Sequence, residues 1–171
     1  MTWLLRNFVL ALSGSDTSLN LAFGALFGWC IGFCPLISPI GPYPNPITLV
    51  LIAFIFVFKV NISLAIAAFI TSKGLSFPLF DIQNQIGESA LRSEALNGVW
   101  TSLYNTPYIA LSGFNHPNIM GGILLGLLFG IFGFPVIIKI TPYYREKILP
   151  KLEKFWIIKV LKGSKLYTTL T

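Results

Sequence analysis

The sequence predicts an all-α integral membrane protein that forms a single membrane domain over residues 1–171. Two long windows, Thr17–Phe58 and Ala95–Ile138, contain no Asp, Glu, Lys or Arg. Hydrophobic residues make up 54% of the chain and charged residues 11%, against about 25% charged in an ordinary soluble domain. Because an ion is costly to bury in hydrocarbon, uncharged windows of this length are typical of segments that lie in a bilayer.

The distribution of charge predicts the orientation in the membrane. Residues 139–171 hold eight basic and two acidic side chains, whereas residues 1–138 hold four of each, so the C-terminal segment carries the whole net charge of +6. Basic segments that follow a hydrophobic span stay on the cytoplasmic side, where they also attract anionic lipid. We therefore expect a cytoplasmic C-terminus, membrane lipid as a partner and no nucleic-acid binding.

The first elements are a short amphipathic helix and a hairpin. Residues 1–12 are predicted to lie at the membrane interface, and residues 18–58 to form a hairpin broken by prolines. Glycines recur at every fourth position of its first arm and would let another helix, of this chain or of a partner, approach closely: Gly24, Gly28 and Gly32. Five prolines then exclude a helix from the hairpin tip: Pro35, Pro39, Pro42, Pro44 and Pro46.

The second arm of the hairpin is short. Residues 47–58 would reach roughly 18 Å as a helix, less than the ~30 Å of a hydrocarbon core. The hairpin therefore either re-enters the membrane or crosses it as a short, tilted span, and the sequence leaves both open.

Residues 62–80 are predicted to cross outward, with Lys73 either snorkelling to the surface or facing a protein cavity. Residues 81–117 are predicted to form an amphipathic segment on the outer surface. Apolar side chains at three- and four-residue spacing over residues 81–105 predict an amphipathic helix there, and residues 106–118 are predicted to form a loop. Its polar candidates are Asp81, Gln85, Glu88, Asn115 and His116. We expect His116, which precedes Pro117, to cap a helix or lie in a turn.

The last span is predicted over residues 118–140 and has its own glycine stripe, Gly122, Gly126 and Gly130. Its likeness to the first glycine segment allows an internal repeat. Residues 142–170 are predicted to form a basic amphipathic helix on the cytoplasmic leaflet, starting at Pro142. The lysines expected to contact anionic lipid are Lys147, Lys151, Lys154, Lys162 and Lys165.

Motifs for catalysis are absent from the sequence. The chain has one histidine and two cysteines, and it lacks the zinc-protease, serine-hydrolase, P-loop and dinucleotide-binding patterns. We therefore expect a protein that is not an enzyme and uses no cofactor and no metal. A membrane-bound enzyme with Asp81, Glu88 and His116 at the interface is the weakest alternative.

A set of short motifs runs through nearly the whole chain. It comprises Pro35-Leu36, Val60-Asn61, Gln85-Ile86-Gly87, Leu103-Tyr104-Asn105, Phe114-Asn115, Tyr144-Arg145 and the segment 159–167. These motifs resemble a family of small, uncharacterised bacterial inner-membrane proteins, which is distantly similar to a wider domain family of unknown function. The resemblance implies a gene beside that of a large AsmA-like envelope protein, a class associated with bridging phospholipid between the inner and outer membranes.

The expected function follows from the resemblance and the glycine stripes together. We expect a multi-pass subunit of the bacterial inner (cytoplasmic) membrane that anchors the AsmA-like partner and helps phospholipid leave the bilayer. The alternative is a small transporter or channel built from two half-repeats.

Overall fold

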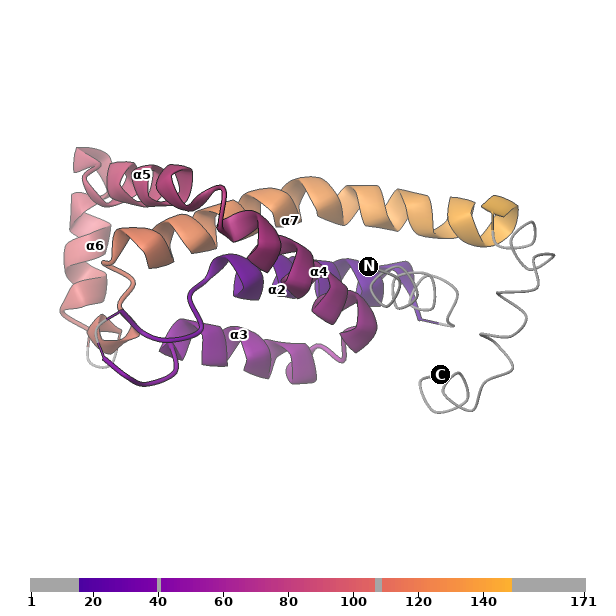
Figure 1. The fold of residues 1–171 in the computed structure, drawn as a ribbon, viewed down its shortest axis with the longest axis horizontal. Coiled ribbons are helices and arrows are strands. Elements are labelled where there is room, and N and C mark those ends of the chain that lie inside the picture. Colours follow the sequence, from indigo (N-terminus) through magenta and orange to yellow (C-terminus); the bar gives the residue numbers. More distant parts are fainter. Residues whose placement is uncertain (1–15, 40, 107–108, 149–171) are drawn as a thin grey trace.

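The computed structural model describes residues 16–39, 41–106 and 109–148, and Figure 1 shows their arrangement. These residues are helical apart from loops and one isolated bridge between Ile37 and Pro44, which confirms the predicted all-α class for this part of the chain. The elements are α2 (Ser18–Phe33), α3 (Pro46–Val57), α4 (Ile62–Ser76), α5 (Phe80–Leu91), η1 (Glu94–Leu96), α6 (Asn97–Tyr104), η2 (Ala110–Ser112), α7 (Pro117–Tyr143) and the π-helical turn η3 (Tyr144–Ile148).

The predicted interfacial helix over residues 1–12 lies outside the described residues. So do four of the lysines expected to contact lipid, Lys151, Lys154, Lys162 and Lys165.

Within the described part, one helical segment is long and apolar enough to cross a membrane. It covers Pro117–Lys147, 31 residues with a mean hydropathy of 2.4 in its most apolar stretch. The helices α4 and α5 qualify together, but they are bent by 91°. The remaining apolar helices, α2 and α3, are shorter.

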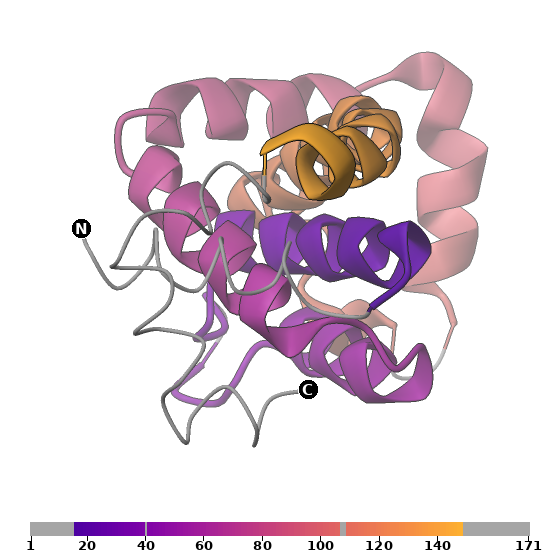
Figure 2. The same cartoon turned by 90° about the vertical axis from the view of Figure 1, so that its right-hand side faces the viewer.

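The central helix is α2, which packs against α4 on one side and α7 on the other (Figures 1 and 2). Its glycines meet successive turns of α4, so these two helices run in the same direction. A Cβ atom at Gly24 would lie 2.6 Å from the carbonyl oxygen of Asn61, and one at Gly32 would lie 2.6 Å from that of Phe69. Only glycine permits this approach of the two backbones.

The glycine stripe of α7 packs against α2 in the opposite direction. A Cβ atom at Gly122 would lie 2.7 Å from the carbonyl oxygen of Phe33, and one at Gly126 would lie 2.6 Å from the Cα of Cys30. The third glycine, Gly130, faces the side chain of Leu26. Both stripes are therefore filled by helices of this chain, which is one of the two kinds of neighbour that the sequence left open.

The likeness between the two glycine segments does not extend to their packing. The stripe of α2 faces α4, whereas the stripe of α7 faces α2. The prolines also differ in role, because α2 ends before Pro35, whereas Pro135 lies inside α7.

The amphipathic helix predicted over residues 81–105 of the outer segment is divided into α5, η1 and α6. Its first part, α5, packs on the N-terminal end of α7, with Gly87 against the carbonyl of Pro117 and Gly121 against that of Gln83. The second helix, α6, lies across the end of the molecule (Figure 1). Two glycines with no regular spacing thus make a helix crossing that the sequence pattern does not reveal.

Two predicted boundaries are wrong. The segment 62–80 is not one straight span, because α4 ends at Ser76 and the chain turns through Pro78, whose nitrogen cannot donate the next helical hydrogen bond. The last helix does not restart at Pro142, because α7 continues through Pro135 and Pro142 to Tyr143. Prolines are tolerated more readily in apolar membrane helices than elsewhere, and α7 passes through both prolines without ending.

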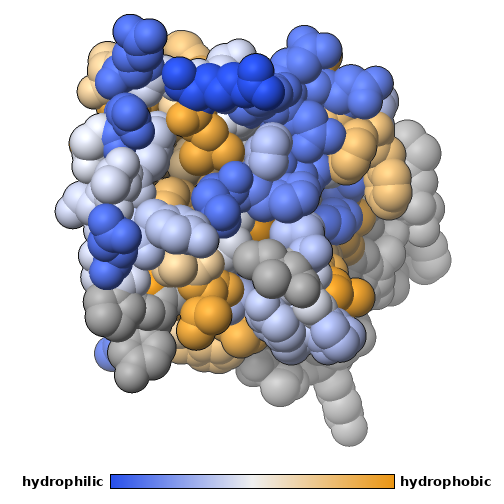
Figure 3. Space-filling model, turned by 90° about the vertical axis from the view of Figure 1, so that its left-hand side faces the viewer, coloured by the Kyte–Doolittle hydropathy of each residue, from blue (hydrophilic) through white to orange (hydrophobic). Residues whose placement is uncertain are grey.

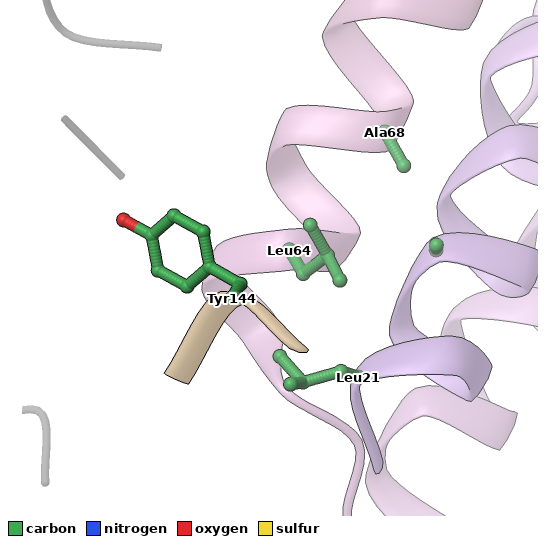
Figure 4. Packing of buried hydrophobic residues seen from close by; sticks show 5 residues of the cluster. Leu21, Leu64, Ala68 and Tyr144 are labelled. Carbon is green, nitrogen blue, oxygen red and sulfur yellow. The ribbon is translucent and has the colours of Figure 1, made fainter. Parts of the chain in front are cut away.

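A small apolar cluster joins the end of α7 to the beginnings of α2 and α4. Its members are Leu21, Ala25, Leu64, Ala68 and Tyr144, and Figure 4 shows Leu21, Leu64 and Tyr144 side by side. This contact places the basic residues Lys139, Arg145 and Lys147 toward one end of the molecule. At the opposite end, where α5 and α6 lie, hydrophilic side chains gather on the surface with apolar patches between them (Figure 3).

Candidate functional site

The C-terminal end of α2 lies inside the molecule, where its last carbonyl groups need hydrogen-bond donors. Side chains from three helices supply them. The hydroxyl of Thr48 on α3 donates to the carbonyl of Pro35, two residues beyond the end of α2, at 3.1 Å. The ammonium of Lys73 on α4 donates to the carbonyl of Cys34 at 3.0 Å, and the amide of Gln83 on α5 donates to that of Phe33 at 3.0 Å. The end of this helix is thus held by polar groups from three directions.

Gln83 is the most connected of these side chains. It is fully buried, and its Nε2 also donates to the carbonyl of Asn118 at 2.8 Å. Its Oε1 accepts a hydrogen bond of 3.3 Å from the hydroxyl of Ser76. One amide therefore joins α2, α4, α5 and α7, and its polar atoms are paired as a buried amide requires.

Lys73 is the only charged residue in α2, α3 and α4. Its side chain is half-buried, and only one of its three N–H donors has a partner among the described residues. It forms no ion pair with a carboxylate of the described residues, whereas Arg92 pairs with Glu88 at 2.6 Å.

A cavity of about 390 Å³ lies beside Lys73, at the bend between α4 and α5. It is lined by Phe33, Pro35, Lys73, Ser76, Phe77, Phe80 and Asn118. The side chains of Phe77 and Phe80 are 79% and 51% exposed, so its wall reaches the molecular surface. Lys73 was expected either to snorkel to the surface or to face a protein cavity, and in the structure it lines a cavity. We call this cavity the Lys73 cavity.

A second cavity of about 220 Å³ lies between α2, α3 and α4. All its accessible surface is apolar, and its lining residues are Gly28, Ile31, Leu36, Ile52, Ile55, Ile62, Ala65, Ile66 and Phe69. Phe69 precedes Lys73 by four residues, so the two side chains follow each other along one face of α4. The same helix thus borders an apolar cavity and, about one turn later, a cationic one. We call the second cavity, between α2, α3 and α4, the apolar cavity.

The polar residues predicted for the outer segment do not gather at this site. Asp81, Gln85 and Glu88 are exposed on α5, and Asn115 is exposed in the loop before α7. His116 caps α7, as its position before Pro117 predicts, and its Nδ1 accepts a hydrogen bond from the backbone N–H of Asn118 at 3.4 Å. All five side chains are exposed, and none of them lines the Lys73 cavity.

The predicted hairpin prolines have separate places. Pro35 lines the Lys73 cavity, and Pro46 is the first residue of α3, where Asn45 caps the helix. Pro39, Pro42 and Pro44 are exposed in the loop between α2 and α3.

Sequence reasoning missed Gln83, Ser76 and Asn118, because nothing in a linear pattern shows that α2 ends beside them. Lys73 carried a signal, since a lone cation in an apolar segment is rare unless it has a function or a partner.

No family model, curated protein or solved structure matches this chain. The family resemblance drawn from its short motifs stays a prediction. The described residues contain no group of three or more His, Cys, Asp or Glu side chains that could hold a metal ion.

Proposed function

We propose that the protein is a non-enzymatic, multi-pass subunit of the bacterial inner membrane that takes phospholipid from the bilayer. It would pass this lipid toward the outer envelope together with a large AsmA-like partner. The observation that carries the proposal is the buried end of α2, where a half-buried cation and a cavity lie among otherwise apolar helices.

The exposed surface of the helices supports a lipid environment. Only 17% of the most apolar stretch of the α7 segment is buried inside the molecule, whereas the core helix of a soluble protein is mostly buried. Large apolar side chains are exposed along α3 and α7, including Leu49, Val50, Phe54, Phe56 and Val57 on α3 and Leu128, Ile131, Phe132, Val136 and Ile140 on α7. Water solvates such continuous apolar surfaces poorly, and acyl chains solvate them well.

The charges at the two ends support an orientation. Lys139, Arg145 and Lys147 lie toward the end of α7, so the positive-inside bias places this end in the cytosol. The hydrophilic end formed by α5 and α6 then faces outward (Figure 3). In this orientation the predicted cytoplasmic lysines, Lys147 among them, would contact the anionic leaflet.

The interrupted helix supports passage of lipid rather than a purely structural role. A helix end and an irregular loop are tolerated at membrane depth only where protein or a cavity satisfies their polar groups. Membrane transporters bind their substrates at such broken helices. Here the polar groups of the broken end adjoin a cavity whose wall reaches the surface, so a lipid could enter from the side.

The partner is the part of the proposal that rests on the family resemblance. Since both glycine stripes are filled from within the chain, a partner's transmembrane anchor would pack against the exposed faces of α3 or α7.

Purification from the native host in a mild detergent tests this function. The expected result is co-purification of a large envelope protein and of phospholipid, neither of which should accompany an unrelated inner-membrane protein carrying the same tag. Isolation of the protein without any envelope protein would contradict the partnership. Flux of a water-soluble solute through proteoliposomes of the isolated protein would instead support the small-transporter alternative.

A further inference from the structure

We propose that the Lys73 cavity binds the phosphodiester headgroup of an anionic phospholipid, with an acyl chain in the neighbouring apolar cavity. This inference rests on the proposed function and names the substrate class of its site.

The charge of the site is the first argument. Lys73 gives one N–H to the carbonyl of Cys34 and keeps two donors without partners in the described part of the chain. A half-buried ammonium with no carboxylate partner loses hydration without full compensation. A phosphate oxygen would accept these donors in charge-assisted hydrogen bonds, which are among the stronger ones in proteins.

Of the other polar residues of the cavity, Asn118 suits an anion. Asn118 lies in the first turn of α7, where the helix dipole favours negative charge, and its side-chain amide makes no hydrogen bond to a described residue. The hydroxyl of Ser76 already donates to Gln83, so its oxygen remains an acceptor. Lys73 and Asn118 therefore provide the donors, and neither is committed to a carboxylate.

The arrangement along α4 suits a molecule with a charged head and an apolar tail. Lys73 borders one cavity and Phe69, one turn earlier, borders the other. The exposed rings of Phe77 and Phe80 flank the Lys73 cavity and would lie against the glycerol region of a lipid. A soluble phosphate compound would use the cation but would leave the apolar cavity empty.

The sign of the charge predicts which lipids are preferred. Phosphatidylglycerol carries a net negative charge, whereas phosphatidylethanolamine brings an ammonium of its own that Lys73 would repel. We expect a preference of about tenfold for phosphatidylglycerol, the effect of one additional favourable charged contact.

A purely structural role for Lys73 makes a different prediction. If this side chain only caps α2, its replacement lowers the melting temperature and leaves the choice of headgroup unchanged. Headgroup preference is therefore the measurement that separates a binding role from a capping role.

The test is native mass spectrometry of the full chain after exchange with equimolar phosphatidylglycerol and phosphatidylethanolamine. The wild type and Lys73→Arg should retain bound phosphatidylglycerol preferentially, and Lys73→Gln should lose the preference. Lys139→Gln, which removes an exposed lysine from α7, is the matched control and should keep it. Asn118→Ala should weaken the preference while the side chains that donate to the end of α2 stay in place. This variant therefore tests the inference even if Lys73→Gln fails to fold.

Several outcomes would overturn the inference. They are a wild type without headgroup preference, a folded Lys73→Gln that keeps it, or an equal loss in Lys139→Gln, which would indicate general surface attraction. Equal competition by millimolar glycerol phosphate would show that the site takes a free phosphate compound instead of a lipid. If the headgroup preference is not found but Lys73→Gln still co-purifies with the envelope partner, the inference about this site fails and the proposed function does not.

Discussion

Glycine spacing in this chain sets how closely α2 can approach its neighbours. The repeat of four residues in α2 and α7 indicates a flat surface from the sequence alone. Which helix fills each surface is a tertiary property, because a stripe of glycines has no side chain that could select a partner. The structure assigns α4 to the stripe of α2 and α2 to that of α7.

A substitution at Gly28 should therefore be costly. Gly28→Val would place its Cβ against the backbone carbonyl of Ala65, and overpacking of this kind costs about 1–3 kcal/mol. We expect a lower melting temperature in detergent. Gly74→Ala is the control, because a Cβ there meets no atom within 4 Å and alanine favours the helix by up to about 1 kcal/mol. Equal melting temperatures for the two variants would show that the stripe is not tightly packed.

Two glutamines of α5 offer a second comparison. Gln83→Ala would remove the buried amide that donates to the carbonyls of Phe33 and Asn118, which costs about 1–3 kcal/mol, so the melting temperature should fall. Gln85→Ala removes an exposed side chain and should change stability by less than about 0.5 kcal/mol. The reverse order of the two melting temperatures would contradict the buried position of Gln83.

Gln85 was an expected polar candidate and Gln83 was not, for an understandable reason. In an amphipathic pattern, polar residues are assigned to solvent unless a partner is known. The partner of Gln83 is the end of a helix fifty residues earlier, Phe33 on α2, and no local pattern reveals that contact.

Among the elements, the helices of the hairpin were the most predictable. Prolines end α2 and begin α3 close to the expected positions, because proline restricts the backbone by itself. The sequence did not predict the bend after α4 or the continuation of α7 through Pro142. In both places the neighbouring helices decide whether a proline ends a helix or is accommodated within it.

The position of the loop between α2 and α3 favours a hairpin that crosses the membrane over one that re-enters it. Figure 1 shows this loop extending to the end of the molecule where α6 lies, and η2 contacts α3. A cysteine at the exposed Tyr43, in a background of Cys30→Ala and Cys34→Ala, should therefore react with a membrane-impermeant maleimide added outside intact spheroplasts.

A cysteine at Lys59 provides the internal control for this labelling. It lies at the corner between α3 and α4, at the other end of the hairpin, and should react only after the membrane is opened. Protection of the Tyr43 position in intact spheroplasts would favour a tip that stays within the membrane or on the cytoplasmic side.

The whole molecule combines two polar ends with an apolar middle, and α2, α3 and α4 in this middle contain one cation, Lys73. Composition predicted the apolar middle, and the C-terminal lysines predicted its direction. Neither could reveal that the cation adjoins a cavity, since this depends on where α2 ends and α4 bends. The functional proposal therefore rests on the tertiary structure, whereas the membrane proposal rests mainly on composition.

The central claim, that α7 crosses a bilayer with its basic end in the cytosol, is tested most directly by labelling both ends of this helix. Single cysteines would replace Asn115 and Lys147, both exposed, in the same cysteine-free background. The account predicts that an impermeant maleimide added outside reaches the Asn115 position and spares the Lys147 position until the membrane is opened. Labelling of both positions from the same side, or recovery of the protein in the supernatant after high-speed centrifugation without detergent, would contradict it.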